Sequence, residues 1–314
     1  LGAGAVFWWI ALAIFFVPFA LMMAEMASTK KSMESSAGMY SWVVEAVGEK
    51  MGFLLAWSYF VANIFYLPTL ASRVPVFLSW TFADFTNLNP TDFESFENAG
   101  ILTASSNPLL FLSLVVLVVF ICSIILLKHE VIFDKMSNTV GTISLVLAII
   151  FIVGGLGIVL TGVNPAVPFE LESYAPTFNV GMLGTLSWLL FAIAGAETIG
   201  SFMNQVENPE KKFPKAIVLG AVIVSLGYIL GTLALSFIVS PDNVSTGSLE
   251  QLIPFMYLQL STYYDFIGPF FVRIVTLGYA LITLVALVLW MAANVKIVFS
   301  ELPEGTFHKF FTKK

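Results

Sequence analysis

Long apolar stretches alternate with short polar segments along the whole chain. Seven of these stretches reach about the 20 residues that an α-helix needs to cross a bilayer. They cover residues 3–24, 51–72, 101–127, 136–160, 177–203, 216–240 and 270–296. The pattern predicts an all-α polytopic membrane protein, in which residues 1–314 form a single transmembrane domain.

Every lysine residue falls in one alternate set of loops or at the same-side end of an expected span. Lys30, Lys128 and Lys211 represent one set of loops, whereas the opposite loops contain acidic residues such as Asp92 and Glu170 and no lysine. Cytoplasmic loops of membrane proteins are enriched in Lys and Arg. We therefore expect a multi-pass protein of the cell membrane, with the N-terminal end outside and the C-terminal end in the cytoplasm.

A further segment, residues 249–264, lies between the last two expected spans and mixes apolar with polar side chains. It is too polar to cross a bilayer. An amphipathic helix of this kind lies at a membrane surface. We expect this external amphipathic segment to form a lid or plug on the outer face.

The composition agrees with this interpretation. Of the 314 residues, 58% are hydrophobic and 11% are charged, whereas a soluble domain has about 25% charged residues. This excludes a soluble enzyme and a disordered chain. Cys122 is the only cysteine, so an intramolecular disulfide is impossible, and the net charge of −6 provides no basic surface for nucleic acid. The expected partner is the lipid bilayer, and we expect no nucleic acid.

Glu197 is the only carboxylate deep inside an expected span, and it follows the small residues Gly195 and Ala196. A charge at this depth is costly and usually functional, and a run of small residues allows a helix to break near the bilayer midplane. Two interpretations stay open. Glu197 either exchanges a coupling proton, or it accepts hydrogen bonds from the backbone groups that the break exposes.

Three polar side chains of the second span, Tyr59, Asn63 and Tyr66, are spaced by four and three residues. This spacing places them on one face of a helix, where they either line a cavity or pack against another helix. The chain has no metal-binding or nucleophile motif and no phosphate-binding loop. We expect no enzymatic activity, no metal and no cofactor.

Two stretches resemble the amino acid–polyamine–organocation (APC) superfamily of secondary transporters. The first is FFVPFALMMAEM at residues 15–26, followed by GMYSW at residues 38–42. The second is Gly195-Ala196-Glu197, followed by ENPEKKFPKA at residues 207–216. Within the superfamily, the chain is most similar to the glutamate/γ-aminobutyrate antiporter-like permeases.

This resemblance implies a LeuT-like fold of two inverted repeats, with helices one and six broken at the midplane. The seven spans match helices two to eight, and Gly195 marks the break of helix six. We expect the sequence to be a fragment of a longer protein. The implied function is secondary active transport of amino acids by alternating access, as antiport or proton-coupled symport, with glutamate/γ-aminobutyrate exchange as an example.

The resemblance also implies a site for a small amino acid substrate. Backbone carbonyl groups at the break would bind the substrate amino group, an aromatic side chain would gate the site, and Glu197 would couple or gate transport. The implied substrate-binding residues are Phe191, Ala192, Ala194 and Gly195 of the broken helix, Ala62, Asn63 and Tyr66 of the second span, and Trp290 of the last span.

Other classes of membrane protein fit less well. A retinal protein needs a lysine near the middle of the last span, whereas Lys296 lies at its cytoplasmic end. A typical seven-span receptor has an external disulfide, which one cysteine cannot form. A channel would need a ring of charged residues along its pore. A secondary transporter is the favoured function, and a receptor or another non-transport membrane protein is the alternative.

Overall fold

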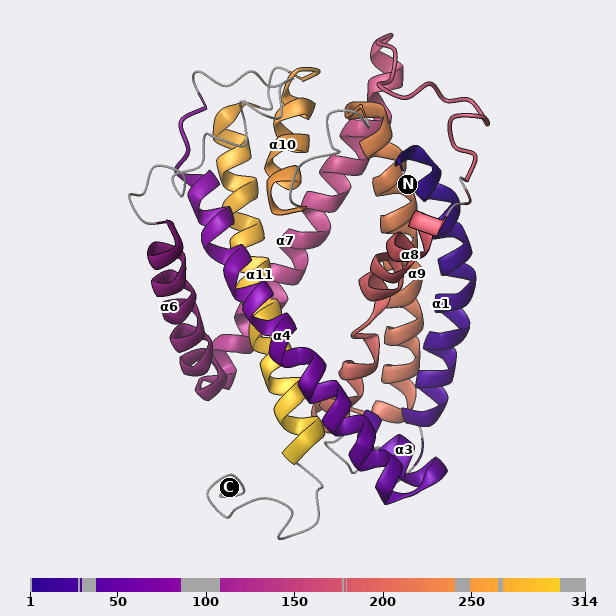
Figure 1. Ribbon diagram of the computed structural model, residues 1–314, viewed down its shortest axis with the longest axis vertical. Coiled ribbons are helices and arrows are strands. Elements are labelled where there is room, and N and C mark those ends of the chain that lie inside the picture. The colour runs from indigo at the N-terminus through magenta and orange to yellow at the C-terminus, as the bar shows by residue number, and fades with distance from the viewer. Residues whose placement is uncertain are drawn as a thin grey trace. The chain divides into compact units, whose positions relative to one another are not determined.

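The computed structural model describes residues 2–27, 29, 38–85, 108–176, 178, 180–240, 249–264 and 268–299, which form helices and turns (Figure 1). In chain order the helices are η1 (Gly2–Gly4), α1 (Ala5–Ala27), α3 (Met39–Val47), α4 (Glu49–Thr81), α6 (Pro108–Lys128), α7 (Glu130–Gly157), η3 (Ile158–Thr161), α8 (Val180–Ile193), η4 (Ala196–Gln205), α9 (Pro209–Ile238), α10 (Leu249–Ser261) and α11 (Pro269–Phe299).

Six helical stretches of the described residues are long and apolar enough to cross a membrane: Ala5–Ala27, Glu49–Thr81, Ile132–Thr161, Met182–Phe202, Pro209–Ile238 and Pro269–Phe299. Each overlaps one predicted span, so the predicted all-α polytopic membrane fold is confirmed. The remaining predicted span, 101–127, contains most of α6, which has 21 residues. Residues 101–107 of this span, and residues 177 and 179 of the fifth, lie outside the described residues, and the count of seven stays a prediction.

Two helices extend well beyond the predicted spans. Helix α4 has 33 residues and continues past Arg73 to Thr81, because a charged side chain ends an apolar stretch without ending a helix. Helix α9 begins at Pro209, ahead of the lysines that precede the apolar stretch. Proline suits the first position of a helix, where its missing N–H group has no helical partner.

The packing of the chain divides it into two compact units. The first contains Leu1–Trp9, Pro68–Asn179 and Leu226–Val288, and the second contains Ile10–Leu67, Val180–Ser225 and Leu289–Lys314. Helices α1, α4, α9 and α11 contribute residues to both units.

The first unit has a large apolar core, formed by parts of α4, α7, α9, α10 and α11. Close helix contacts in this core depend on small residues. A Cβ atom added at Gly155 of α7 would lie 2.7 Å from the Cβ atom of Ala234 on α9. Such contacts between small residues let neighbouring helices approach closely in membrane proteins.

Helix α10, which lies between α7 and α11 in Figure 1, is part of this core. The side chains of Phe255, Tyr257 and Leu260 are fully buried. The Tyr257 hydroxyl group donates a hydrogen bond of 2.7 Å to the carbonyl oxygen of Leu147 on α7. The helix predicted in residues 249–264 therefore packs firmly against its own unit, and its placement outside the bilayer stays a prediction.

In the second unit, the helix η4 lies against α3 and the end of α11. A Cβ atom added at Gly200 would lie 2.6 Å from Cζ2 of Trp42. The Lys296 amino group of α11 lies 4.2 Å from the ring centroid of Phe202. These contacts hold the chain that follows the predicted helix break.

Candidate functional site

The predicted helix break occurs at Gly195. Helix α8 ends at Ile193, Ala194 and Gly195 form a turn, and the 3₁₀-helix η4 begins at Ala196. The φ angle of Gly195 is 104°, a value that glycine adopts readily and residues with a Cβ atom rarely do. The helix break expected at Gly195 is thus confirmed, with regular α-helix ending at Ile193.

The Glu197 side chain folds back onto this break. The backbone N–H group of Gly195 donates to both carboxylate oxygens, at 3.1 Å to Oε1 and 2.9 Å to Oε2. The hydroxyl group of Tyr59 on α4 donates a further hydrogen bond of 3.0 Å to Oε1. The carboxylate therefore satisfies a backbone group that the break exposes and also connects the break to α4.

Thr198 completes the turn from the other side. Its hydroxyl group donates a hydrogen bond of 2.6 Å to the carbonyl oxygen of Gly195, and its backbone N–H group donates to the same oxygen at 3.0 Å. Buried backbone groups that lack partners are costly in a membrane. Both polar groups of Gly195 thus have local partners.

Aromatic side chains from three helices meet beside the break. The Trp290 ring of α11 stacks on Tyr59, with centroids 6.3 Å apart and planes at 16°. Tyr66 packs edge-on against Trp290 and against Phe191 of α8, with centroids 5.1 Å apart in both pairs. Of the predicted site residues, the structure thus brings Tyr66, Phe191, Trp290 and Glu197 into one neighbourhood.

Three more of the predicted substrate-binding residues are Asn63 and Ala62 on α4 and Ala192 on α8. The Asn63 side chain is buried, and its amide nitrogen donates a hydrogen bond of 2.8 Å to the backbone oxygen of Tyr59, one turn earlier. The Ala62 side chain is exposed. Ala192 lies in the last turn of α8, before the break. A role of these three residues in substrate binding stays a prediction.

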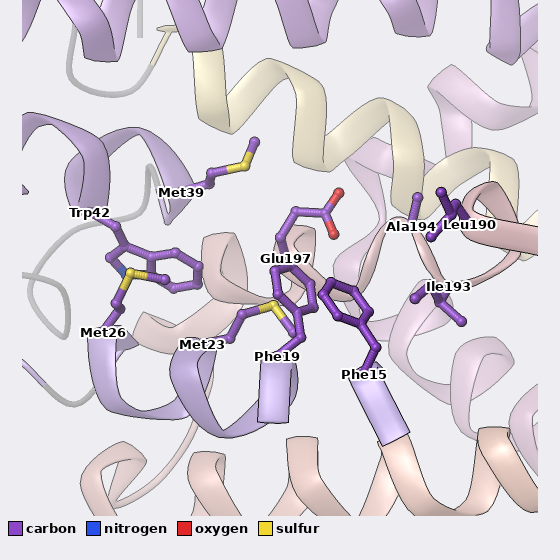
Figure 2. Close-up of a pocket in the computed structure, with 10 residues that line it drawn as sticks. All are labelled: Phe15, Phe19, Met23, Met26, Met39, Trp42, Leu190, Ile193, Ala194 and Glu197. Carbon is purple, nitrogen blue, oxygen red and sulfur yellow. The ribbon is translucent and has the colours of Figure 1, made fainter. Parts of the chain in front are cut away.

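A cavity of about 360 Å³ lies on the α1 side of Glu197, within the second unit. Its walls come from α1, α3, α8 and the break, and they are apolar except at Glu197. The lining residues are Phe15, Phe19, Met23, Met26, Met39, Trp42, Leu190, Ile193, Ala194 and Glu197. Figure 2 shows Glu197 in the middle of this group, between Met39 and the α1 side chains of Phe19 and Met23.

Sequence reasoning missed most of this cavity. Phe15, Phe19, Met23 and Met26 recur at intervals of four, four and three residues, a spacing that places side chains on one helix face. This pattern is also common in ordinary helix packing, so it does not distinguish cavity-lining residues from residues that pack against another helix. Among the described residues, no group of three His, Cys, Asp or Glu side chains could hold a metal ion.

A model of the amino acid permease family matches residues 1–314 of the chain. The aspartate/glutamate permease AcaP of Lactococcus lactis subsp. cremoris is 28% identical over 242 residues, which is 76% of this chain and 46% of the relative. The probable agmatine/putrescine antiporter AguD of Lactococcus lactis subsp. lactis is 24% identical over 317 residues, which is 100% of this chain and 61% of the relative.

The inner membrane transporter YjeM of Escherichia coli K12 is 31% identical over 221 residues, which is 69% of this chain and 42% of the relative. The chain thus spans about half the length of the curated relatives that it matches.

Proposed function

Because this chain belongs to the amino acid permease family, we propose that the protein containing it is a secondary transporter of amino acids or of the amines derived from them. The transporter works by alternating access in the cell membrane, as an antiporter or as a proton-coupled symporter. Family membership argues against a receptor or another non-transport membrane protein. Two relatives support this substrate range. One is named as an aspartate/glutamate permease, and the other as a probable agmatine/putrescine antiporter.

The observation that carries the proposal is the hydrogen bond between Tyr59 and Glu197 at the Gly195 break. Broken helices with exposed backbone groups form the substrate and ion sites of many secondary transporters. Here the break separates α8 from η4, and Glu197 is the only ionisable side chain at the turn. The Tyr59 hydroxyl group holds the first turn of η4 to α4 as long as the Glu197 carboxylate accepts its hydrogen bond.

We assign Glu197 the role of coupling or gating group. Protonation of its carboxylate removes one negative charge and converts one oxygen into a donor. The hydrogen bonds from Tyr59 and Gly195 are then weaker, because hydrogen bonds to a charged acceptor are about twice as strong as those to a neutral one. The proton thereby changes how firmly η4 is held to α4, which provides a physical link between proton binding and movement of η4.

The test is Glu197→Gln in the complete protein, reconstituted into liposomes. Glutamine keeps the size of the side chain and an acceptor oxygen, but it cannot titrate. Uptake of radiolabelled substrate by the variant should lose its dependence on pH, while substrate binding remains. Glu207→Gln is the matched control, because the Glu207 side chain is 87% exposed and pairs with Lys212.

An unchanged pH profile in the Glu197→Gln protein would limit Glu197 to bracing the helix break. In that case Glu197→Ala should unfold the protein, whereas Glu197→Gln should be tolerated in both folding and transport.

The orientation and the substrate-binding residues belong to the same proposal. The distribution of lysines supports an external N-terminal end and a cytoplasmic C-terminal end for this chain. Phe191, Tyr66 and Trp290 form an aromatic wall beside the break, and we assign Phe191 the gate because its side chain is 45% exposed. Glutamate/γ-aminobutyrate exchange is one activity within this proposal.

A further inference from the structure

Two tyrosine hydroxyl groups anchor α10 and the turn that follows it to α7. The Tyr257 hydroxyl group donates a hydrogen bond of 2.7 Å to the carbonyl oxygen of Leu147. The Tyr264 hydroxyl group donates one of 2.8 Å to the carbonyl oxygen of Gly154. Positions 147 and 154 lie about two helical turns apart. The two anchors therefore fix α10 along the length of α7 as well as against its surface.

Two glycine residues of α7 shape its surface to fit this segment. A Cβ atom added at Gly154 would lie 2.9 Å from Cδ2 of Leu260. A Cβ atom added at Gly157 would lie 2.8 Å from the hydroxyl oxygen of Tyr264. Small residues allow such close approach between helices in membrane proteins. The contact between α7 and α10 thus leaves no room for a side chain at either position.

Helix α10 is also held from the side of α11, and Figure 1 shows it between α7 and α11. The ring of Tyr257 lies 5.4 Å from that of Phe151 on α7. On α11, its centroid lies 6.2 Å from that of Phe271 and 6.4 Å from that of Tyr279. One side chain of α10 therefore packs against both neighbouring helices at once.

Separation of α10 from these helices would expose a large apolar surface. The side chains of Phe255, Tyr257 and Leu260 are fully buried. Full burial of a large apolar side chain favours the packed state by about tenfold or more. Three such side chains together favour it by about a thousandfold or more. An undocked α10 is therefore a rare state of the first unit.

Resting on the transport function proposed above, we infer that α10 is a fixed plug of its unit and not a moving lid. The helix stays bound to α7 and α11 throughout the transport cycle, and Tyr257 and Tyr264 are the residues that position it. A lid would have to leave these neighbours each time the transporter opened, whereas the contacts of α10 are buried and include backbone groups of α7. Access to the substrate site then changes through other segments of the protein.

A disulfide bond between α10 and α7 tests this inference in the complete protein. Cys122→Ser removes the native thiol, and Gly154→Cys and Leu260→Cys supply the pair. Cγ of Leu260, the position that a cysteine sulfur takes, lies 3.5 Å from the Cβ position of residue 154, which is close enough for a bond that joins Cβ atoms about 3.5–4.5 Å apart. In liposomes, the oxidised protein should take up radiolabelled glutamate or agmatine as fast as the reduced protein.

Loss of uptake on oxidation, with recovery on reduction, would overturn the fixed plug. The two single-cysteine variants receive the same treatment and reveal any effect of the oxidant alone. Mass spectrometry of the oxidised double variant measures how much of the protein carries the bond.

Hydrogen exchange measures the docking of α10 without any need for transport. Segments that open during function are drawn from the least stable parts of a protein. In the complete protein in detergent, the backbone amides of residues 255–260 should exchange within about a hundredfold of the rate of those on the facing part of α7. Exchange faster than this would mean that α10 undocks as a lid does.

The two hydroxyl groups have their own test by the same measurement. Tyr257→Phe and Tyr264→Phe keep the ring but each remove one hydrogen bond to α7, so exchange in α10 should become about twofold to tenfold faster. Tyr263→Phe is the matched control, because Tyr263 packs on the same core but its hydroxyl group forms no hydrogen bond with the described residues. Unchanged exchange in both test variants would show that these hydroxyl groups do not position α10.

The two measurements separate this inference from the proposed function. If the wild-type protein takes up neither glutamate nor agmatine, the transport function fails, and slow exchange in α10 still supports a fixed plug. If the reduced double variant transports but the oxidised one does not, the transport function stands and the fixed plug fails.

Discussion

A methyl group on Gly195 would lie 2.6 Å from Cζ2 of Trp290 and 3.0 Å from its Cη2. The indole ring of Trp290 therefore packs directly on the backbone of the helix break. In addition, the φ angle of 104° at Gly195 disfavours any residue with a Cβ atom. Two independent physical reasons thus require glycine at this position.

Gly195→Ala should destabilise the complete protein and strongly reduce its transport activity. The backbone strain alone costs about 1–3 kcal/mol, and the contact with Trp290 adds to it. The measurement is thermal stability in detergent, followed by substrate uptake into liposomes. Gly227→Ala on α9 is the control, because no atom lies within 4 Å of the added Cβ atom. Equal stability of the two variants would contradict the structure at the break.

Combining Gly195→Ala with Trp290→Ala separates the two reasons. Removal of the indole ring should restore the part of the stability that the contact costs, while the part due to the φ angle remains. Complete restoration of the stability would show that a Cβ atom at position 195 does not strain the backbone.

Tyr59→Phe should weaken the link between α4 and the first turn of η4. Phenylalanine can keep the stacking with Trp290 but loses the hydrogen bond to Glu197, worth about 1.5–3 kcal/mol for a charged acceptor. Thermal stability should fall for Tyr59→Phe, and Tyr59→Phe combined with Glu197→Gln should cost less than the sum of the single changes. Tyr263→Phe is the control, because its hydroxyl group forms no hydrogen bond with the described residues. Strict additivity would mean that the two side chains do not interact.

The helix break could be predicted because its cause is local. A carboxylate that follows glycine and other small residues inside an apolar stretch is costly in a continuous helix, and Gly195 and Glu197 show this in the sequence. The Tyr59–Glu197 bond could not be predicted, because it joins residues 138 positions apart. The spacing of Tyr59, Asn63 and Tyr66 indicated a shared face but not what that face contacts.

The boundaries of the helices show a second limit of the sequence. The length of an apolar stretch reflects the thickness of the bilayer, whereas backbone hydrogen bonding decides where a helix ends. Helix α4 therefore continues past Arg73 through Pro75 to Thr81. The burial of Phe255 and Tyr257 in α10 likewise depends on neighbours from distant parts of the chain, and the amphipathic pattern of residues 249–264 could not reveal it.

Gly155→Leu should destabilise the first unit. The added side chain would begin 2.7 Å from Cβ of Ala234 and 3.0 Å from its carbonyl oxygen, so α7 and α9 would have to separate. Overpacking of this kind costs about 1–3 kcal/mol. Gly141→Leu, on the same helix, is the matched control because the space around its Cβ position is open. Thermal unfolding of both variants in detergent provides the comparison, and similar melting temperatures would contradict the close contact.

The orientation of the chain is tested by cysteine labelling of intact cells. Cys122 is exposed on α6, so it is first replaced by serine to remove the background. Single cysteines are then introduced in place of Lys211 and of Asn87. Lys211 belongs to a lysine-rich loop, and Asn87 lies in a segment outside the described residues. Because lysine-rich loops stay in the cytoplasm, a membrane-impermeant maleimide should label position 87 in intact cells and label position 211 only after permeabilisation. Labelling of position 211 in intact cells, with none at position 87, would invert the topology. The external segment assigned to residues 249–264 would then lie on the cytoplasmic side.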